Sequence, residues 1–252
     1  MSEVLTEVDG NVLVITINRP EAKNAVNQAV AQGIAAALDR LDAEADLRCA
    51  IITGAGGTFC SGMDLKAFVK GEKPYVEGRG FAGMAERGAK KPLIAAVDGY
   101  ALAGGMEVAL ACDLIVASAS AQFGIPEAKR GLAAAAGGLI KLPRQIQPRI
   151  AMELALTGDF IGAARAYELG FINRISEGPA LAEARALAER IAANGPMALI
   201  ASKAVVSQSH EWSEGEMWDK QQAIVGPVFM SADAREGATA FAEKRKPNWQ
   251  GK

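Results

Sequence analysis

Two glutamates, Glu107 and Glu127, stand 20 residues apart in an otherwise apolar stretch that runs from Pro92 to Gly131. Each glutamate follows a glycine-containing segment, at Gly104-Gly105 for the first and at Gly124 for the second. Carboxylates are rarely buried without a partner, so both placements need a chemical reason. One such reason is proton transfer, because a carboxyl group in apolar surroundings can hold a proton near neutral pH.

Glycine turns near these acids could supply a second element of catalysis. The turns at Gly62-Met63 and Gly104-Gly105 could each direct a backbone N–H at one carbonyl oxygen and stabilise an enolate. The two glutamates could then exchange protons with a substrate and a water molecule. The pattern therefore suggests chemistry at the carbons beside an acyl carbonyl.

A structural role explains the same residues without any chemistry. A glutamate near the start of a helix interacts favourably with the helix dipole, and Glu127 follows a proline, a common first residue of helices. Most glycine-rich turns are simply turns. On spacing alone, catalysis by Glu107 and Glu127 is one hypothesis beside this structural one.

Several other kinds of site are disfavoured. His210 is the single histidine, which argues against histidine-rich zinc sites, and we expect it at the surface. The three cysteines lack metal-binding spacing and are interpreted as reduced thiols of a cytoplasmic protein. Gly78–Gly83 matches the dinucleotide-binding pattern G-x-G-x-x-G, but no strand is expected immediately before it. We therefore expect neither a metal nor a nicotinamide cofactor.

Composition points to a globular protein of one large or two small domains. Of the 252 residues, half are hydrophobic and 22% are charged, and the net charge is −2. This balance gives no basic surface for nucleic acid. Asp98, Glu107 and Asp113 interrupt the most apolar stretch, so we expect a buried core and no membrane segment there.

Hydrophobic periodicity predicts an α/β core followed by helices. A strand over 11–18, a helix capped by Asn27 and a strand over 48–53 favour a mostly parallel sheet. A helix is expected to open near Asp64, and the aperiodic segment 71–80 is expected to be a mobile loop. We predict a core over 1–178 and a helical region over 179–252. Further predicted elements are helices from 131 to about 142, over 145–156 and 163–169, a strand over 171–175, and helices at about 180–193, 196–209, 213–224 and 231–245.

Three motifs together resemble the crotonase (enoyl-CoA hydratase/isomerase) superfamily: Phe59–Leu65, Ile94–Asp113 and Phe123–Glu127. The resemblance covers nearly the whole chain, from the Asn18-Arg-Pro segment to the Phe241–Lys246 tail. It implies an α/β fold, a spiral of β-β-α units with a helical C-terminal trimerisation region. It also implies a hydratase or dehydratase that adds water syn across the 2,3-double bond of an enoyl-CoA thioester, or removes it.

The resemblance assigns roles by position. Glu107 and Glu127 match the two catalytic glutamates, and the N–H groups of Met63 and Gly104 match the oxyanion hole. Coenzyme A is part of the substrate, so no cofactor is implied, and the expected partners are an acyl-CoA thioester and copies of the chain in a homotrimer or a dimer of trimers. The positions that match the coenzyme A and substrate site are Lys23, Ala25, Ser61, Asp64, Leu65, Lys66, Phe241 and Lys244.

Some features bear on the acyl group and leave alternatives open. Pro126–Gly131, Arg245–Trp249 and Met63–Lys66 resemble carnitinyl-CoA dehydratase-like members. Leu132–Gly138 lacks the proline-rich turn usual in hydratases, and Ala103 replaces a common third glycine, so acyl preference is in question. The alternatives are an enoyl-CoA double-bond isomerase, a non-catalytic acyl-CoA-binding scaffold and an RNA-binding protein.

Overall fold

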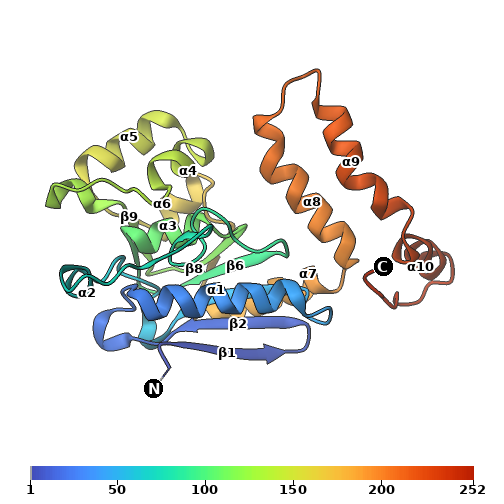
Figure 1. Cartoon of the computed structure of the whole chain (residues 1–252), viewed down its shortest axis with the longest axis horizontal. Coiled ribbons are helices and arrows are strands. Elements are labelled where there is room, and N and C mark those ends of the chain that lie inside the picture. Colours follow the sequence, from blue (N-terminus) through green and yellow to red (C-terminus); the bar gives the residue numbers. More distant parts are fainter. Residues whose placement is uncertain (1) are drawn as a thin grey trace.

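A six-stranded sheet forms the centre of the computed structural model, which describes residues 2–252. Its strand order is β1-β2-β3-β6-β8-β11, antiparallel between the first two strands and parallel elsewhere (Figure 1). A hairpin turn joins the first two strands at Gly10, whose φ of 56° suits glycine. The strands are β1 (Val4–Asp9), β2 (Val12–Ile17), β3 (Cys49–Gly54), β6 (Leu93–Val97), β8 (Leu114–Ser118) and β11 (Arg174–Ser176).

A smaller sheet lies beside the large one and carries the chain toward the glutamates. Its order is β10-β9-β7, made of β10 (Ile161–Gly162), β9 (Gln122–Gly124) and β7 (Tyr100–Leu102). Strand β6 of the large sheet is followed by β7 of the small sheet and then by α3 (Gly104–Leu110). Strand β8 is likewise followed by β9 and then by further helices, α4 (Gly138–Gln145) and α5 (Pro148–Thr157). This alternation gives the predicted spiral of β-β-α units.

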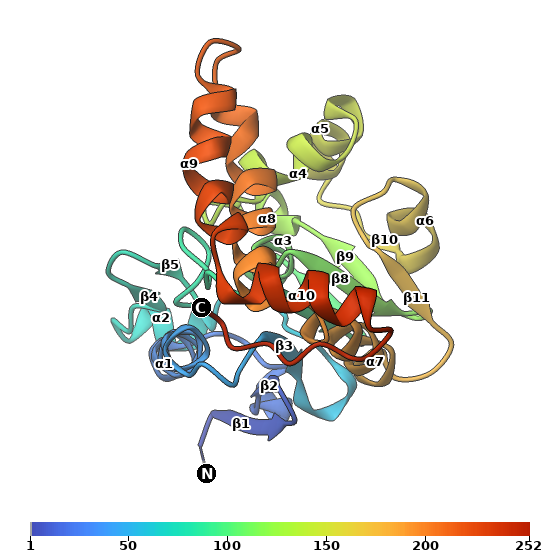
Figure 2. The same cartoon turned by 90° about the vertical axis from the view of Figure 1, so that its right-hand side faces the viewer.

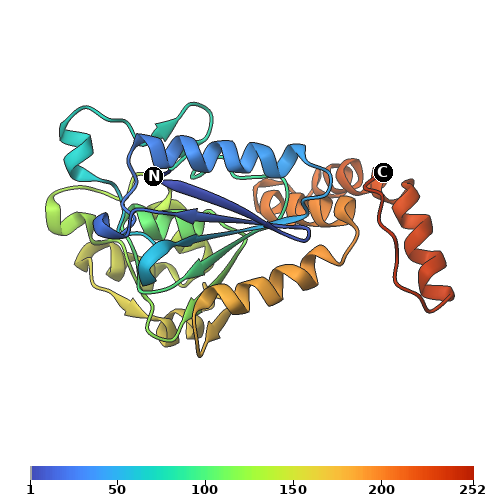
Figure 3. The same ribbon diagram turned by 90° about the horizontal axis from the view of Figure 1, so that it is seen from below.

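Helices cover both faces of the large sheet, with α1 (Gln28–Ala43) on one side and α7 (Ala180–Ala192) on the other (Figure 3). Asn27 caps α1 as predicted, because its side chain accepts a hydrogen bond from the N–H of Val30 at 3.0 Å. In α7 a row of alanines at every fourth position allows the helix to pack closely on the sheet: Ala180, Ala184, Ala188 and Ala192.

The last three helices form an arm beyond the sheet (Figure 1), and they face the viewer in Figure 2: α8 (Pro196–Gln208), α9 (Met217–Phe229) and α10 (Ala232–Ala242). Lys203 attaches α8 to the core, since its ammonium group lies 2.7 Å from the Asp113 carboxylate and donates to the Lys91 carbonyl at 3.0 Å. The division at residue 178 stays a prediction, although α7 packs on the sheet while α8 to α10 extend from it.

The structure corrects several element boundaries. Residues 132–136 are not helical, and α4 begins only at Gly138 and continues through Pro143. The predicted loop over 71–80 contains a small hairpin of β4 (Tyr75–Val76) and β5 (Gly80–Phe81). The strand expected over 171–175 corresponds to β11, which begins three residues later, at Arg174. The helix expected over 163–169 corresponds to α6 (Ala163–Glu168).

The structure also bears on the dinucleotide-binding pattern and on the expected lack of a membrane segment. The pattern Gly78–Gly83 is preceded by the two-residue strand β4, where no strand was expected, but it continues into the β4–β5 hairpin and opens no helix, so it lacks the context of a dinucleotide site. Within residues 2–252, no helix combines the length and apolar character required to cross a membrane. His210 is exposed, as predicted, and the three cysteines are free and buried.

Candidate active site

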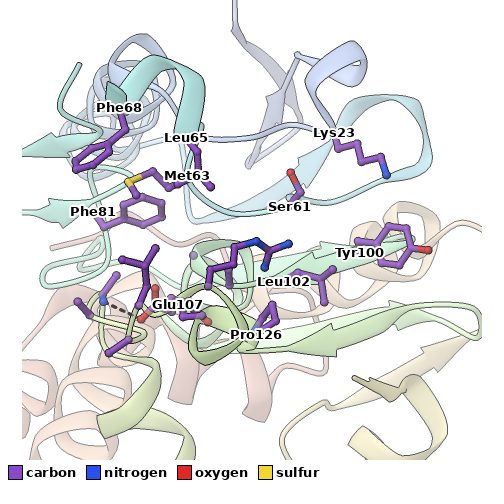
Figure 4. Close-up of a pocket in the computed structure, with 18 of the residues that line it drawn as sticks. Lys23, Ser61, Met63, Leu65, Phe68, Phe81, Tyr100, Leu102, Glu107 and Pro126 are labelled. Atoms are coloured by element: carbon purple, nitrogen blue, oxygen red, sulfur yellow. Dashed lines mark hydrogen bonds between the residues drawn. The ribbon is translucent and has the colours of Figure 1, made fainter. Parts of the chain in front are cut away.

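A cavity of about 650 Å³ opens where the small sheet, α2 (Leu65–Val69) and the turn after β9 meet. Its lining contains both glutamates, Glu107 and Glu127, together with Met63 and Gly104. Glu107 and Met63 are labelled in Figure 4. These residues come from three separate parts of the sequence, since Gly104 and Glu107 both belong to α3, and they surround one space, as chemistry at a carbonyl requires.

Two backbone hydrogen bonds with Val26 hold the turn at Gly62-Met63, and neither of them uses the Met63 N–H. The Val26 N–H donates to the Gly62 carbonyl at 2.8 Å, and the Asp64 N–H donates to the Val26 carbonyl at 2.9 Å. Because bonds in such a parallel pairing come from residues on either side of Met63, the Met63 N–H points away from Val26. Among residues 2–252 it has no hydrogen-bond acceptor, so it can serve a ligand.

The turn before α3 brings a second N–H to the same place. Ala103 has φ 51° and ψ −129°, a conformation that a residue with a Cβ rarely adopts and that costs of order 1–3 kcal/mol. Its N–H donates to the Gly124 carbonyl at 2.8 Å, which helps to hold the strained turn. The N–H of Gly104 has no acceptor within residues 2–252.

The two turns are in direct contact. A Cβ added to Gly62 would lie 3.2 Å from the Gly104 nitrogen and 2.9 Å from the Ala103 Cβ. Gly62 also has φ 104°, so its glycine is required both for space and for conformation. The N–H groups of Met63 and Gly104 thus come from adjoining backbone segments, as an oxyanion hole requires.

Glu107 lies on the first turn of α3 and is 3% exposed. Its Oε1 accepts hydrogen bonds from the N–H groups of Ala136 at 2.7 Å and Gly138 at 2.9 Å. Figure 4 labels Glu107 and marks a hydrogen bond to its carboxyl group with a dashed line. Burial raises the pKa of Glu107, while these two donors and the charge of Lys141 act in the opposite direction. The carboxyl group is therefore fixed in place by the segment that leads into α4.

Glu127 has a different environment, in the short 3-10 helix over Pro126–Arg130. Its Oε2 is buried and has no hydrogen-bond partner within residues 2–252. Burial is the main cause that raises the pKa of Glu127 to about 7, the nearby charge of Glu107 adds to it, and Arg130 opposes it. Glu127 can therefore carry a proton near neutral pH, which makes it a candidate general acid.

Three residues expected at the substrate site from the resemblance also line the cavity, namely Lys23, Ser61 and Leu65. The Lys23 ammonium group lies 5.7 Å from the centre of the Tyr100 ring, and the Ser61 N–H donates to the Lys23 carbonyl at 3.0 Å. One end of the cavity therefore presents a cation and a hydroxyl group beside the two turns.

The other five expected residues do not line the cavity of this single chain. Asp64 caps α2 and pairs with Arg19 at 2.9 Å, Ala25 is buried, and Lys66 is exposed on α2. Phe241, which is 88% exposed, lies on α10, and Lys244 just follows that helix, at the opposite end of the molecule from α2 (Figure 1). These two residues therefore do not contribute to the cavity of their own chain.

Sequence reasoning missed other residues that line the cavity. Arg130 lies three residues after Glu127, and this spacing in a helical turn could have placed both on one face. The aromatic and apolar wall gave no comparable signal, because its members come from distant segments: Phe68, Tyr75, Phe81, Tyr100, Leu102 and Phe160. Leu132, in the segment that sequence reasoning linked to acyl preference, also lines the cavity. Within the described part of the chain, no group of three or more possible metal ligands is present.

Comparison with known proteins identifies the class that this fold and site define. The profile of the family described as "Enoyl-CoA hydratase/isomerase" matches residues 7–252. The chain therefore belongs to the enoyl-CoA hydratase/isomerase family, and the resemblance inferred from the three motifs is confirmed.

Individual relatives fall within the same class. The chain is 43% identical over 258 residues to "Enoyl-CoA hydratase EchA19" of Mycobacterium tuberculosis, with 98% of this chain and 96% of that protein covered. It is 40% identical to "Carnitinyl-CoA dehydratase" of Proteus mirabilis, with 96% of each covered. A crystal structure of an enoyl-CoA hydratase from M. tuberculosis H37Rv is similar with a TM-score of 0.98, 58% identity and full coverage of both chains.

Proposed function

We propose that this protein is an enoyl-CoA hydratase or dehydratase, which adds water syn across the 2,3-double bond of an enoyl-CoA thioester or removes it. The observation that carries the proposal is the presence of two unlike glutamates, Glu107 and Glu127, in one cavity with two backbone N–H donors. Relatives described as an enoyl-CoA hydratase and a carnitinyl-CoA dehydratase support the same class of reaction.

The N–H groups of Met63 and Gly104 bind the thioester carbonyl oxygen in this mechanism. As water attacks carbon 3, electrons move from the double bond toward this oxygen, and the two donors stabilise the developing enolate charge. Because the donors belong to the backbone of contacting turns, they need little rearrangement when the charge develops.

The two glutamates together hold one proton. In this mechanism the proton is on Glu127 in the free enzyme, since its pKa of about 7 allows it to hold one, and Glu107 reacts as the carboxylate that accepts from its two backbone donors. Glu107 takes a proton from the attacking water, and Glu127 gives its proton to carbon 2. The proton left on Glu107 returns to Glu127 through water, and dehydration follows the same steps in reverse.

Coenzyme A binding completes the proposal. Lys23, Ser61 and Leu65 line the cavity, while Ala25, Asp64 and Lys66 lie on the two segments that lead to it. Phe241 and Lys244 would reach the site from a neighbouring subunit of a homotrimer or a dimer of trimers. The reaction needs no cofactor apart from the coenzyme A of the substrate. A cytoplasmic location is also proposed, since the three cysteines are free.

The test uses four-carbon 2-enoyl-CoA and 3-enoyl-CoA with the full-length protein. A hydratase removes the conjugated double bond and gives a product heavier by one water. A double-bond isomerase would instead convert the 3-enoyl ester into the 2-enoyl ester without a change in mass. Formation of the isomer alone, or coenzyme A ester binding without turnover on a panel of thioesters, would contradict the proposal.

A further inference from the structure

A second cavity of about 450 Å³ adjoins the one that holds the two glutamates. Both cavities are lined by Glu127, Leu132 and Ala133, so these residues form a shared wall. Beyond that wall the second cavity extends along α4 and α5, where Leu142 and Ala155 contribute to its lining. We refer to it as the distal cavity.

The distal cavity has the chemical character of a hydrocarbon site. Apart from Glu127, all its lining residues are Ala, Gly, Ile, Leu, Met or Pro, and none is aromatic. A hydrocarbon chain gains free energy on entering such a space. A quaternary ammonium group would lose hydration there without an aromatic ring to receive it, and the single carboxyl group of the lining, Glu127, lies at the shared wall.

The proposed reaction directs an acyl chain toward this space. The thioester oxygen is fixed at the N–H groups of Met63 and Gly104, and carbon 2 must lie within reach of Glu127 to receive its proton. Substituents on carbon 3 therefore leave the reacting centre close to Glu127, at the shared wall. The wall is formed in part by Leu132 and Ala133, in the non-helical segment 132–136.

We infer that the preferred substrates are enoyl-CoA esters with an apolar acyl chain longer than four carbons, whose far end occupies the distal cavity. Esters with a trimethylammonium group at that position, as in a carnitine-like chain, are disfavoured. This inference rests on the proposed function, because it uses the position of the reacting carbons. It also selects between the two activities named for relatives, in favour of the enoyl-CoA hydratase.

Binding of saturated acyl-CoA esters provides a test that does not need turnover. Dissociation constants for chains of four to twelve carbons are measured by calorimetry, beside kcat/KM for the matching 2-enoyl esters and one trimethylammonium ester. We expect affinity to increase by up to roughly fourfold for each added methylene, the factor that corresponds to its burial, until the cavity is full. The trimethylammonium ester should bind at least about tenfold more weakly than an apolar ester of equal length.

Ala155→Trp places a large side chain in the distal cavity, since Ala155 lines it and is only partly buried in α5. We expect a loss of about tenfold or more in affinity and kcat/KM at ten carbons, and less than about twofold at four carbons. Glu153→Trp is the matched control, because Glu153 is exposed on the same helix and does not line the cavity. Met152→Ala, which widens the lining, is a second variant if Ala155→Trp does not fold.

The outcomes separate the two hypotheses. Absence of turnover for every ester, including the four-carbon one, would refute the proposed function, whereas affinity that does not depend on chain length would refute the distal-cavity inference. The inference would also fail if affinity still depended on chain length in Ala155→Trp as it does in the unsubstituted protein. It would fail, too, if Ala155→Trp changed the assembly mass measured by light scattering but not the affinity for any ester, because a second copy of the chain would then cover the distal cavity. If Met152→Ala is needed, an unchanged preference among chain lengths would overturn the inference.

Discussion

The two glutamates of the cavity belong to regions that are built in different ways. Glu107 is a buried residue of α3, and the backbone leading into α4 donates two hydrogen bonds to one of its oxygens. Glu127 lies in a short 3-10 helix at the edge of the small sheet, and one of its oxygens is buried without a partner. This difference suits the two side chains to the opposite roles proposed for them, with Glu107 accepting one proton and Glu127 donating another.

The largest effects are expected when the carboxyl group of Glu107 or of Glu127 is removed. In the proposed mechanism, Glu107→Gln removes the group that accepts a proton from water, and Glu127→Gln removes the group that donates a proton to carbon 2. We expect each to lower kcat for hydration of a 2-enoyl-CoA by about 10²–10⁴-fold, measured by loss of enoyl absorbance. Glu153→Gln, an exposed residue of α5, is the control and should leave kcat unchanged. Near-normal turnover in both active-site variants would exclude this mechanism.

A smaller change affects only the support of Glu107. In Gly138→Ala the added Cβ would lie 3.1 Å from both Cγ and Oε1 of Glu107, so the carboxyl group must shift. Such a shift of a catalytic group is expected to lower kcat by roughly 10–100-fold while the protein stays folded. Gly215→Ala is a matched control, since its Cβ would meet nothing within 4 Å. Unchanged kcat in Gly138→Ala would mean that the hydrogen bonds from this segment do not position Glu107.

The pH dependence of kcat/KM tests the role of Glu127 in the unsubstituted protein. The active free enzyme carries one proton on the pair, and this proton leaves as the pH rises through the Glu127 pKa of about 7. We expect kcat/KM for hydration to fall about tenfold per pH unit above that value. Dehydration should show the same decline, because it uses the same singly protonated enzyme. A flat profile from pH 6 to 9 would show that Glu127 does not hold the reacting proton.

The smallest expected effect concerns the charge of Arg130. Arg130 is exposed, lines the cavity and lowers the pKa of Glu127, so Arg130→Gln should raise that pKa. Solvent screens an exposed charge, and we therefore expect the decline in kcat/KM to move upward by no more than about half a pH unit. Lys129→Gln is the control, because Lys129 pairs with Asp159 at 2.8 Å and does not line the cavity. A downward shift in Arg130→Gln would contradict the assigned electrostatic effect.

Much of the scaffold follows from local sequence. The Asp9-Gly10 turn, the Asn27 cap and the apolar run at Cys49–Gly54 each specify their own element, and the structure contains all three. Residues 132–136 are an exception, since the intrinsic preference of alanine for helices predicts a helix there. The N–H groups of Ala136 and Gly138 instead bond to Glu107, and a residue distant in the sequence thereby outweighs local propensity.

By itself, the sequence determined which residue types could do the chemistry and, through three motifs, the family to which the chain belongs. Only the tertiary structure decided that Glu107 is held by two backbone donors while Glu127 is left with an unpartnered oxygen. It also decided that Ala103 is strained and that a distal cavity adjoins the site. The physical reason is that burial, hydrogen bonding and cavity shape arise between segments far apart in the chain, whereas motifs and caps are local.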